Sequence, residues 1–273
     1  MDVKPIGVFD SGIGGMTVVK ELFTTVPHES IVYFGDTARV PYGAKSRDTV
    51  RRYAREDTEL MLAHGVKMIV VACNTVSAVA LDEVERMAGT IPVIGMIAPT
   101  AKEAVRATRT GRIGIIGTEA TIASQAYEDA IAIEADRQSK PCETFSVACP
   151  LFVPLAEEGW TDHPATELVA EEYLRPLREQ HIDTLVLGCT HYPVLLDIIQ
   201  KTIGKNVTLV NSGAEAAKVV AAKLPNPSTL IPLPSSILVS DMPRKFQQIG
   251  ERFLGRPMPE AKLVTWKESW VVS

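Results

Sequence analysis

The sequence has few aromatic residues, few cysteines and no excess of positive charge. Aromatic residues make up 6% of the 273 positions, and there are four cysteines. Four cysteines are too few for a disulfide-stabilised fold of this length, so each is either a small buried side chain or a working thiol. The 28 Lys and Arg against 33 Asp and Glu give a net charge of −5, without the basic footprint of a nucleic-acid-binding protein.

Long hydrophobic runs and targeting signals are also missing. No apolar stretch reaches the roughly 18 residues that a membrane helix needs. An acidic residue at position 2 and an early Gly-rich turn are not typical of a signal peptide. With 46% hydrophobic and 22% charged residues, the chain has the composition of a folded protein rather than a disordered one. We therefore expect a cytoplasmic globular protein that binds neither membrane nor nucleic acid.

Short apolar runs alternate with amphipathic segments along most of the chain, which predicts an α/β protein with mostly parallel, doubly wound sheets. Strands are expected at residues 5–9, 30–34, 68–72, 93–97, 112–117, 184–188 and 207–210. Helices are expected at residues 17–24, 46–64, 75–87, 99–108, 166–180 and 213–224. A Pro-rich stretch at residues 224–234 interrupts the pattern, followed by a strand, a helix and a tail with Trp266 and Trp270.

A weak internal repeat divides the chain. IGVFDSG at residues 6–12 resembles IGIIGTE at 113–119, and KMIVVACNT at 67–75 resembles DTLVLGCTH at 183–191. Both members of the second pair end on a cysteine that small polar residues follow. The repeat predicts two related α/β domains, each with a mostly parallel sheet flanked by helices, and an active-site cleft between them. Residues 1–97 plus 210–273 are expected to form the first domain and residues 98–209 the second.

Polar residues cluster where the predicted strands end, and ligands of open parallel sheets bind beyond those carboxyl ends. The clusters are DSGIGG (10–15), GDTARVPYG (35–43), CNT (73–75), GTEAT (117–121) and CTHYP (189–193). DSGIGG can present backbone N–H groups to an anion, but it lacks the third glycine of a dinucleotide fingerprint and the Lys-Ser/Thr of a phosphate loop. A plain strand–helix turn is the alternative for this segment.

Cys73 and Cys189 would face each other across such a cleft, each before an expected helix start that favours a thiolate. One thiolate would remove a proton from a substrate carbon while the other thiol delivers a proton to the opposite face, which predicts a two-base racemase or epimerase. Asp10 and His191 are the natural assistants of these transfers. A metal site is not expected, because close Cys/His pair spacings are absent.

The other two cysteines, Cys142 and Cys149, lie in a stretch without a polar pattern. A lone cysteine in such a context is more often a small hydrophobic side chain than a nucleophile. We expect both to be packing residues.

Taken together, DSGIGG, GDTARVPYG, VVACNT, CPLFVPLAEEG and LGCTHYP resemble the motifs of glutamate racemases, in order, from about residue 5 to residue 215. The resemblance implies cofactor-independent and metal-free interconversion of L- and D-glutamate for peptidoglycan synthesis, in a homodimer. It implies that Cys73 and Cys189 transfer protons, that Asp10 assists the first thiol, and that His191 and Glu157 assist the second. The implied substrate contacts are Asp10, Ser11, Tyr42, Gly43, Asn74, Thr75, Thr190 and His191, with Thr118 and Thr121 from the second domain.

Other interpretations stay open at this point. Racemases of the wider superfamily that act on aspartate or a hydantoin share the paired cysteines. Cys189 and His191 alone also fit a covalent thiol hydrolase or acyltransferase, and a racemase fold can serve as a sensing or protein-binding module. Spacing does not choose between Glu157 and Glu158, either of which fits a solvated helix-end carboxylate, and Tyr42 also fits a plain turn.

Overall fold

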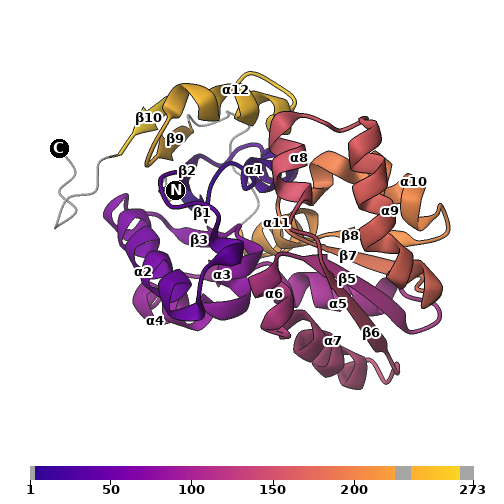
Figure 1. Cartoon of the computed structure of the whole chain (residues 1–273). Coiled ribbons are helices and arrows are strands. Elements are labelled where there is room, and N and C mark those ends of the chain that lie inside the picture. Colours follow the sequence, from indigo (N-terminus) through magenta and orange to yellow (C-terminus); the bar gives the residue numbers. More distant parts are fainter. Residues whose placement is uncertain (1–3, 225–234, 265–273) are drawn as a thin grey trace.

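The described part of the chain forms two parallel sheets with helices packed around them (Figure 1). It comprises residues 4–224 and 235–264 of a computed structural model. The Pro-rich stretch from residue 225 to 234 and the tail with Trp266 and Trp270 lie outside the described residues. This architecture confirms the α/β class predicted from the alternating pattern.

The larger sheet has six strands in the order β10-β9-β2-β1-β3-β4, and all neighbouring pairs are parallel. Every residue of β1 and β2 is buried, as expected for strands covered on both faces. The register pairs Asp10 with Gly35, which places Asp10 at the carboxyl edge of the sheet. The strands are β1 (Ile6–Asp10), β2 (Ile31–Gly35), β3 (Met68–Val71), β4 (Val93–Ile94), β9 (Ser236–Val239) and β10 (Ala261–Leu263).

The smaller sheet has four parallel strands in the order β6-β5-β7-β8. They are β5 (Arg112–Gly117), β6 (Glu143–Ala148), β7 (Thr184–Gly188) and β8 (Thr208–Asn211). This order repeats the order β2-β1-β3-β4 of the larger sheet, with β5 and β7 in the places of β1 and β3. The weak sequence repeat therefore corresponds to equivalent strands in the two halves of the molecule.

Helices connect the strands, and two of the predicted segments differ from the structure. The helix expected at residues 75–87 is two helices, because Ala80 has φ −143° and interrupts the helical backbone. The strand expected at 93–97 ends at Ile94, because Ile97 already begins a helix whose first turn accommodates Pro99. The longer helices are α1 (Met16–Thr25), α2 (Arg47–Ala63), α5 (Ile97–Ala107), α7 (Ala126–Arg137), α9 (Pro164–Glu179), α11 (Ser212–Lys223) and α12 (Pro243–Leu254).

Several short elements were not predicted from the sequence. They include strands β6 and β10 and the short helices α6 (Glu119–Ala123), α8 (Phe152–Glu158) and α10 (Leu196–Ile203). The interrupted helix consists of α3 (Asn74–Val79) and α4 (Leu81–Ala88), and the two 3₁₀ turns are η1 (Tyr42–Ala44) and η2 (Tyr192–Leu195). Helices α3, α6 and α8 and the turn η2 each follow the carboxyl end of a strand, so they shape the region where polar side chains gather.

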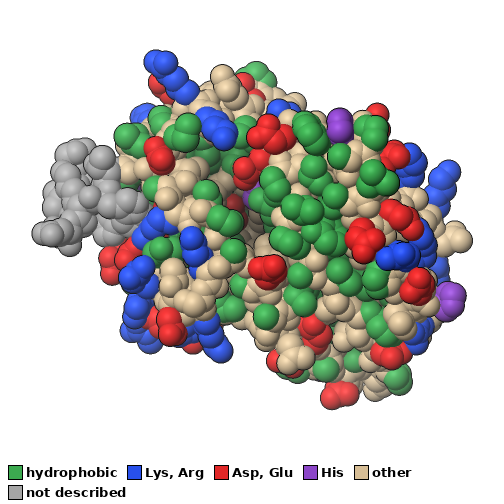
Figure 2. Space-filling view, in the orientation of Figure 1, with side chains coloured by type: hydrophobic (Ala, Val, Ile, Leu, Met, Phe, Trp, Pro, Cys, Tyr) green, Lys and Arg blue, Asp and Glu red, His purple; other side chains and the backbone are tan. Residues whose placement is uncertain are grey.

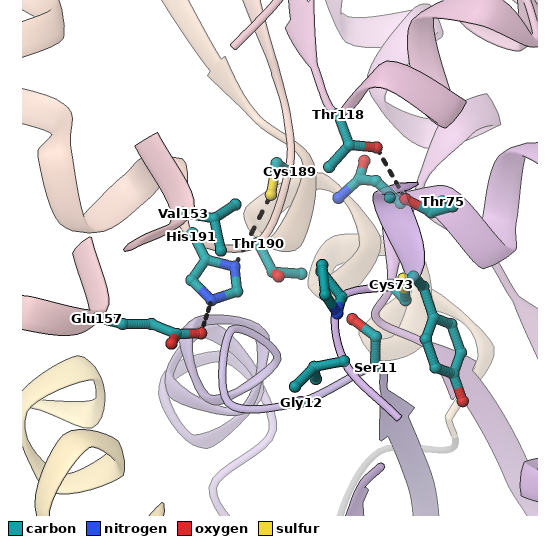
Figure 3. A pocket seen from close by; sticks show the side chains of 15 residues that line it. Ser11, Gly12, Cys73, Thr75, Thr118, Val153, Glu157, Cys189, Thr190 and His191 are labelled. Carbon is teal, nitrogen blue, oxygen red and sulfur yellow. Dashed lines mark hydrogen bonds and ion pairs between the residues drawn. The ribbon is translucent and has the colours of Figure 1, made fainter. Parts of the chain in front are cut away.

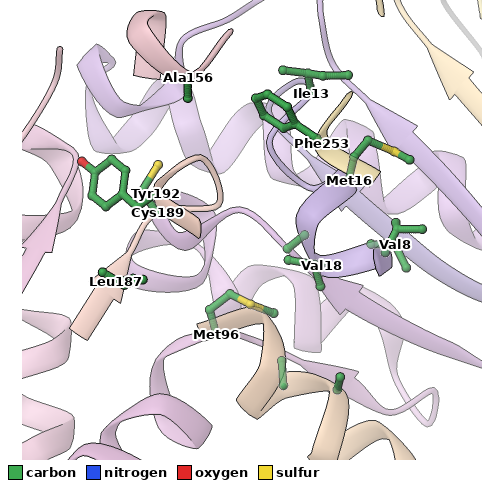
Figure 4. Packing of buried hydrophobic residues seen from close by; sticks show 14 of the residues in the cluster. Val8, Ile13, Met16, Val18, Met96, Ala156, Leu187, Cys189, Tyr192 and Phe253 are labelled. Carbon is green, nitrogen blue, oxygen red and sulfur yellow. The ribbon is translucent and has the colours of Figure 1, made fainter. Parts of the chain in front are cut away.

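One buried apolar cluster crosses between the two halves (Figure 4). Met16 and Val18 of the first half and Cys189 and Tyr192 of the second belong to this cluster. Helix α11 contacts α1 on one side and α5 on the other. Since interiors pack densely and yield little, this shared core holds the strand ends of the two sheets in fixed proximity. Within residues 4–224 and 235–264, no helix has the length and apolar character to cross a membrane.

Candidate active site

A pocket lies where the carboxyl ends of both sets of strands meet, and the surface is hollowed between the two halves (Figure 2). Its empty volume, including the part open to solvent, is about 450 Å³. Cys73 and Cys189 both line it and lie on opposite sides of the group of side chains (Figure 3). The other lining residues are Ser11, Gly12, Val40, Pro41, Tyr42, Gly43, Asn74, Thr75, Thr118, Val153, Glu157, Thr190 and His191.

Asp10 lies fully buried beneath the pocket at the end of β1. Its Oδ2 accepts hydrogen bonds from the backbone N–H groups of Gly12 (3.1 Å) and Gly15 (3.0 Å) in the turn into α1. Among the described residues, Oδ1 has no hydrogen-bond partner. Burial raises the pKa of Asp10, against the opposing effects of His191 and the backbone donors. A carboxylate with one unengaged oxygen can accept a proton or an ammonium hydrogen.

Cys73 follows β3 and precedes α3, and it is 5% exposed. Burial, followed by the charge of Asp10, raises its pKa to about 12, although Val76 and Ser11 donate hydrogen bonds that oppose the shift. The helix N-terminus, which was expected to favour a thiolate here, does not outweigh burial and the charge of Asp10. Helix α3 has six residues, and its terminal field is weaker than the cost of burying a charge beside a carboxylate. Cys73 is a neutral thiol at neutral pH.

Cys189 belongs to a chain of three polar side chains on the other side of the pocket (Figure 3). Its Sγ lies 3.8 Å from His191 Nδ1, and His191 Nε2 lies 3.0 Å from Glu157 Oε1. Residues after Cys189 enter the 3₁₀ turn η2 rather than the predicted α-helix start. The structure places Glu157, and not its neighbour Glu158, on the imidazole, because the α8 backbone turns Glu157 toward the pocket.

The histidine of this chain is protonated at neutral pH. Burial opposes its charge, but the contacts with Cys189 and Glu157 outweigh burial and raise the pKa of His191 to about 10. Burial raises the pKa of Glu157, but the hydrogen bond and charge of His191 and the charge of Lys245 together lower it by more. The pKa of Glu157 is therefore below its usual value. A cation beside a cysteine sulfur is the arrangement that activates thiolates in enzymes.

Small hydroxyl and amide side chains join the two halves around the pocket. Thr75 Oγ1 lies 2.9 Å from Thr118 Oγ1 and 3.2 Å from Thr121 Oγ1, so the first turn of α3 meets the N-terminus of α6. Asn74 accepts a 2.5 Å hydrogen bond from the hydroxyl of Tyr127, and its Nδ2 lies 3.3 Å from Ser212 Oγ. These contacts fix polar groups that face the pocket from both halves.

Two glycines allow the halves to approach. A Cβ at Gly14 would lie 2.2 Å from Thr190 Oγ1 and 2.5 Å from His191 Nδ1. A Cβ at Gly43 would lie 2.5 Å from Thr118 Cβ. Real Cβ atoms do not make such short contacts, so these positions require glycine for the pocket to close as it does.

The site therefore brings together every residue that the sequence indicated, with Asp10 and Thr121 just behind the lining. Sequence reasoning gave no role to the apolar lining residues Val40, Pro41 and Val153, because apolar residues in a loop or a short helix carry no pattern that distinguishes pocket lining from packing. Cys142 and Cys149 do not line this pocket. Cys149 is fully buried in the apolar core, and all four cysteines are free thiols.

The two parallel-sheet halves and the thiols at equivalent strand ends define an isomerase of the two-thiol racemase class. The sequence model of the Asp/Glu/Hydantoin racemase family matches residues 6–220, and the chain belongs to that family.

Two relatives with high sequence identity to this chain are glutamate racemases. The glutamate racemase of Chlorobaculum tepidum is 55% identical over 266 residues, which cover 96% of each chain. The glutamate racemase of Neisseria meningitidis serogroup B is 46% identical over 266 residues, 96% of this chain and 97% of that one.

A crystal structure of glutamate racemase from Francisella tularensis in complex with D-glutamate superposes with a TM-score of 0.88 at 40% identity. The superposition covers 97% of this chain and 98% of that one. An aspartate racemase of Picrophilus torridus has a TM-score of 0.51 at 19% identity, over 81% of this chain and 95% of that one, a likeness in fold alone.

Proposed function

We propose that this chain interconverts L- and D-glutamate by moving the α-proton between two thiols. The observation that carries the proposal is the placement of Cys73 and Cys189 on opposite sides of one pocket, each at the end of an equivalent strand. When the α-carbon lies between two sulfurs, one sulfur removes its proton from one face and the other sulfur protonates the resulting planar carbanion from the opposite face, which inverts the stereocentre.

The protonation states of the two sides give the reaction a starting direction. Cys73 begins as a thiol, and the cationic His191 lies 3.8 Å from the sulfur of Cys189, which we assign as the first proton acceptor. The Cys189 thiolate takes the α-proton, and the Cys73 thiol then gives its proton to the opposite face of the carbanion. The product leaves Cys73 as a thiolate and Cys189 as a thiol, which is the state that the opposite enantiomer requires.

Asp10 and the pair of His191 and Glu157 assist these transfers. We assign to Asp10 Oδ1, which has no hydrogen-bond partner within the described residues, the role of accepting from the Cys73 thiol or from the substrate ammonium. On the other side, Glu157 supports the charge of His191, which in turn lies against the sulfur of Cys189. Each thiol thus has a partner that lowers the cost of its change in charge.

The carbanion itself needs preorganised donors, because a thiolate is a far weaker base than an amino acid α-carbanion. We assign this role to the small polar side chains and backbone groups that line the pocket and bind the substrate carboxylates and ammonium. They are Ser11, Tyr42, Gly43, Asn74, Thr75, Thr118 and Thr190, with Thr121 behind Thr75. These donors are uncharged, so they bind the anionic substrate without placing a positive charge beside the carboxylate of Asp10.

The choice of glutamate over aspartate or a hydantoin rests on the relatives at 45–55% identity, which are glutamate racemases. Incubating the pure protein with L-glutamate in D₂O should give D-glutamate and α-deuterated product. Aspartate and a hydantoin serve as competing substrates, and a preference for either would overturn the assignment. A covalent Cys–His reaction would need Cys189 but not Cys73, so activity that survives Cys73→Ala would point to that chemistry.

The cellular setting follows from the same assignment. We propose a cytoplasmic enzyme that supplies D-glutamate for peptidoglycan synthesis and acts as a homodimer, which sedimentation analysis of the pure protein tests. We also propose residues 1–97 plus 210–273 as one domain and residues 98–209 as the other. The strands of the two sheets support this division except at β8, a strand of the smaller sheet inside which residue 210 lies, directly before the helix α11 that contacts α1 and α5.

A further inference from the structure

A buried cluster of charged groups lies behind the Tyr42 side chain, outside the pocket. Tyr42, Asp36 and Asp57 are fully buried, and Asp57 comes from the middle of α2. Arg39 Nε lies 2.5 Å from Asp36 Oδ2, and Arg39 Nη2 lies 3.3 Å from Asp57 Oδ1. Ser240 donates a 2.8 Å hydrogen bond to Asp36 Oδ1. Neither the motif spacing nor the pocket lining indicates a role for Asp57.

The protons around the Tyr42 hydroxyl do not suffice for two ionised carboxylates. Tyr42 Oη makes a short hydrogen bond with Asp36 Oδ2 and lies 3.1 Å from Asp57 Oδ2. A phenol has one hydrogen, so it donates fully to only one of the two oxygens. Asp36 already receives Arg39 and Ser240 as further donors, whereas both contacts of Asp57 are longer than those of Asp36. The second contact at Tyr42 therefore needs a proton from Asp57.

We propose that Asp57 is a neutral carboxylic acid that positions Tyr42, donating its Oδ2 proton to Tyr42 Oη while Tyr42 donates its own proton to Asp36. Asp57 Oδ1 then accepts from Arg39. Electrostatics agree with this order, because burial and then the charge of Asp36 raise the pKa of Asp57 well above its usual value, despite Arg39. Burial and the two carboxyl groups likewise raise the pKa of Tyr42, so the phenol keeps its proton.

The hydrogen bonds from Asp57 to Tyr42 and from Tyr42 to Asp36 affect substrate binding through the loop that carries Tyr42. Tyr42 opens the 3₁₀ turn η1, and Val40, Pro41 and Gly43 beside it form one wall of the pocket. Anchoring the phenol at two oxygens fixes the position of that wall relative to the substrate. Asp57 is thus a positioning residue for substrate binding, a role that rests on the proposed racemase function.

Three variants test the proton assignment. Asp57→Asn keeps a donor toward Tyr42 and an acceptor toward Arg39, so its KM for glutamate should match the unsubstituted protein. Asp57→Ala removes both, and its KM should rise about tenfold with little change in kcat. Glu56→Gln is the matched control, because Glu56 is the adjacent carboxylate on α2 and pairs with Arg39 without a hydrogen bond to Tyr42. Its KM should stay unchanged.

A spectroscopic readout and a double mutant make the test independent of folding. The infrared difference spectrum of unsubstituted protein minus Asp57→Asn at pH 7 should contain the carbonyl band of a protonated carboxylic acid. In a Tyr42→Phe background, Asp57→Ala should add little to KM, because the two act as one unit.

An Asp57→Asn variant as impaired as Asp57→Ala, or a difference spectrum with only carboxylate bands, would overturn the proposal. The infrared result decides the matter even where Asp57→Ala fails to fold. Absence of racemisation by the unsubstituted protein would instead refute the proposed function, so the two failures are distinguishable.

Discussion

Replacing Gly14 with alanine should inactivate the enzyme while leaving it folded. The added Cβ would lie 2.2 Å from Thr190 Oγ1 and 2.5 Å from His191 Nδ1, whereas ordinary contact begins near 3.4 Å. Both side chains are buried, and His191 is held between Cys189 and Glu157. The contact is therefore relieved by a shift of about 1 Å between the two sides of the site. A misplacement of that size in a catalytic constellation costs about 100-fold in rate.

The assay is the circular dichroism of glutamate followed from each enantiomer, with unfolding by urea measured in parallel. We expect kcat/KM to fall about 100-fold in both directions and the free energy of unfolding to fall by about 1–3 kcal/mol, as overpacking does. Gly65→Ala is the control, because a Cβ there meets no atom within 4 Å and its φ of +63° costs stability alone. Wild-type kcat/KM in Gly14→Ala would refute the close-approach argument.

Three further perturbations follow from the same geometry. Glu157→Gln removes a contact that raises the pKa of His191, so the imidazolium is lost at lower pH and the alkaline limb of kcat/KM should move down by about 1–2 pH units; an unmoved limb would contradict the His191–Glu157 coupling. Thr118→Ala removes the cap of α6 and the contact with Thr75, and should lower the free energy of unfolding by about 1 kcal/mol, with Thr118→Ser restoring it. Asp183 has its pKa lowered to about 2 from 3.8, with donors at Thr108 and the following backbone opposing burial. Its stabilisation is present above pH 4 and is lost as the pH falls toward 2, so Asp183→Asn should cost about 2 kcal/mol in urea unfolding at pH 7 and less under acid. A pH-independent cost would refute the carboxylate's role.

Local sequence was sufficient for the elements that carry the site. Continuous apolar runs predict β1, β3, β5 and β7, because a strand covered on both faces has no polar positions. The predictions differ from the structure where an element is too short to show a full repeat of the hydrophobic pattern. The break in the helix at Ala80 and the strand β6 are two such places. A six-residue strand with half-buried residues has no continuous apolar run to reveal it.

The candidate residues were also accessible from sequence, since parallel strands converge at their carboxyl ends and chemistry gathers there. Cys73 and Cys189 follow equivalent strands, and the repeat already indicated that they belong to matching halves. Motif position alone therefore indicated which residue types share one pocket.

The protonation states and the hydrogen-bond partners of those residues depend on the tertiary structure. Burial beside Asp10 makes Cys73 a neutral thiol, and the packing of α8 brings Glu157 rather than Glu158 to His191. The contact of Tyr42 with Asp57 joins residues 15 positions apart on different elements. Desolvation and the distance between charges depend on how remote segments pack, and no local pattern encodes either quantity. The motifs indicate which groups enter the cleft, and the folded structure determines which of them carry protons.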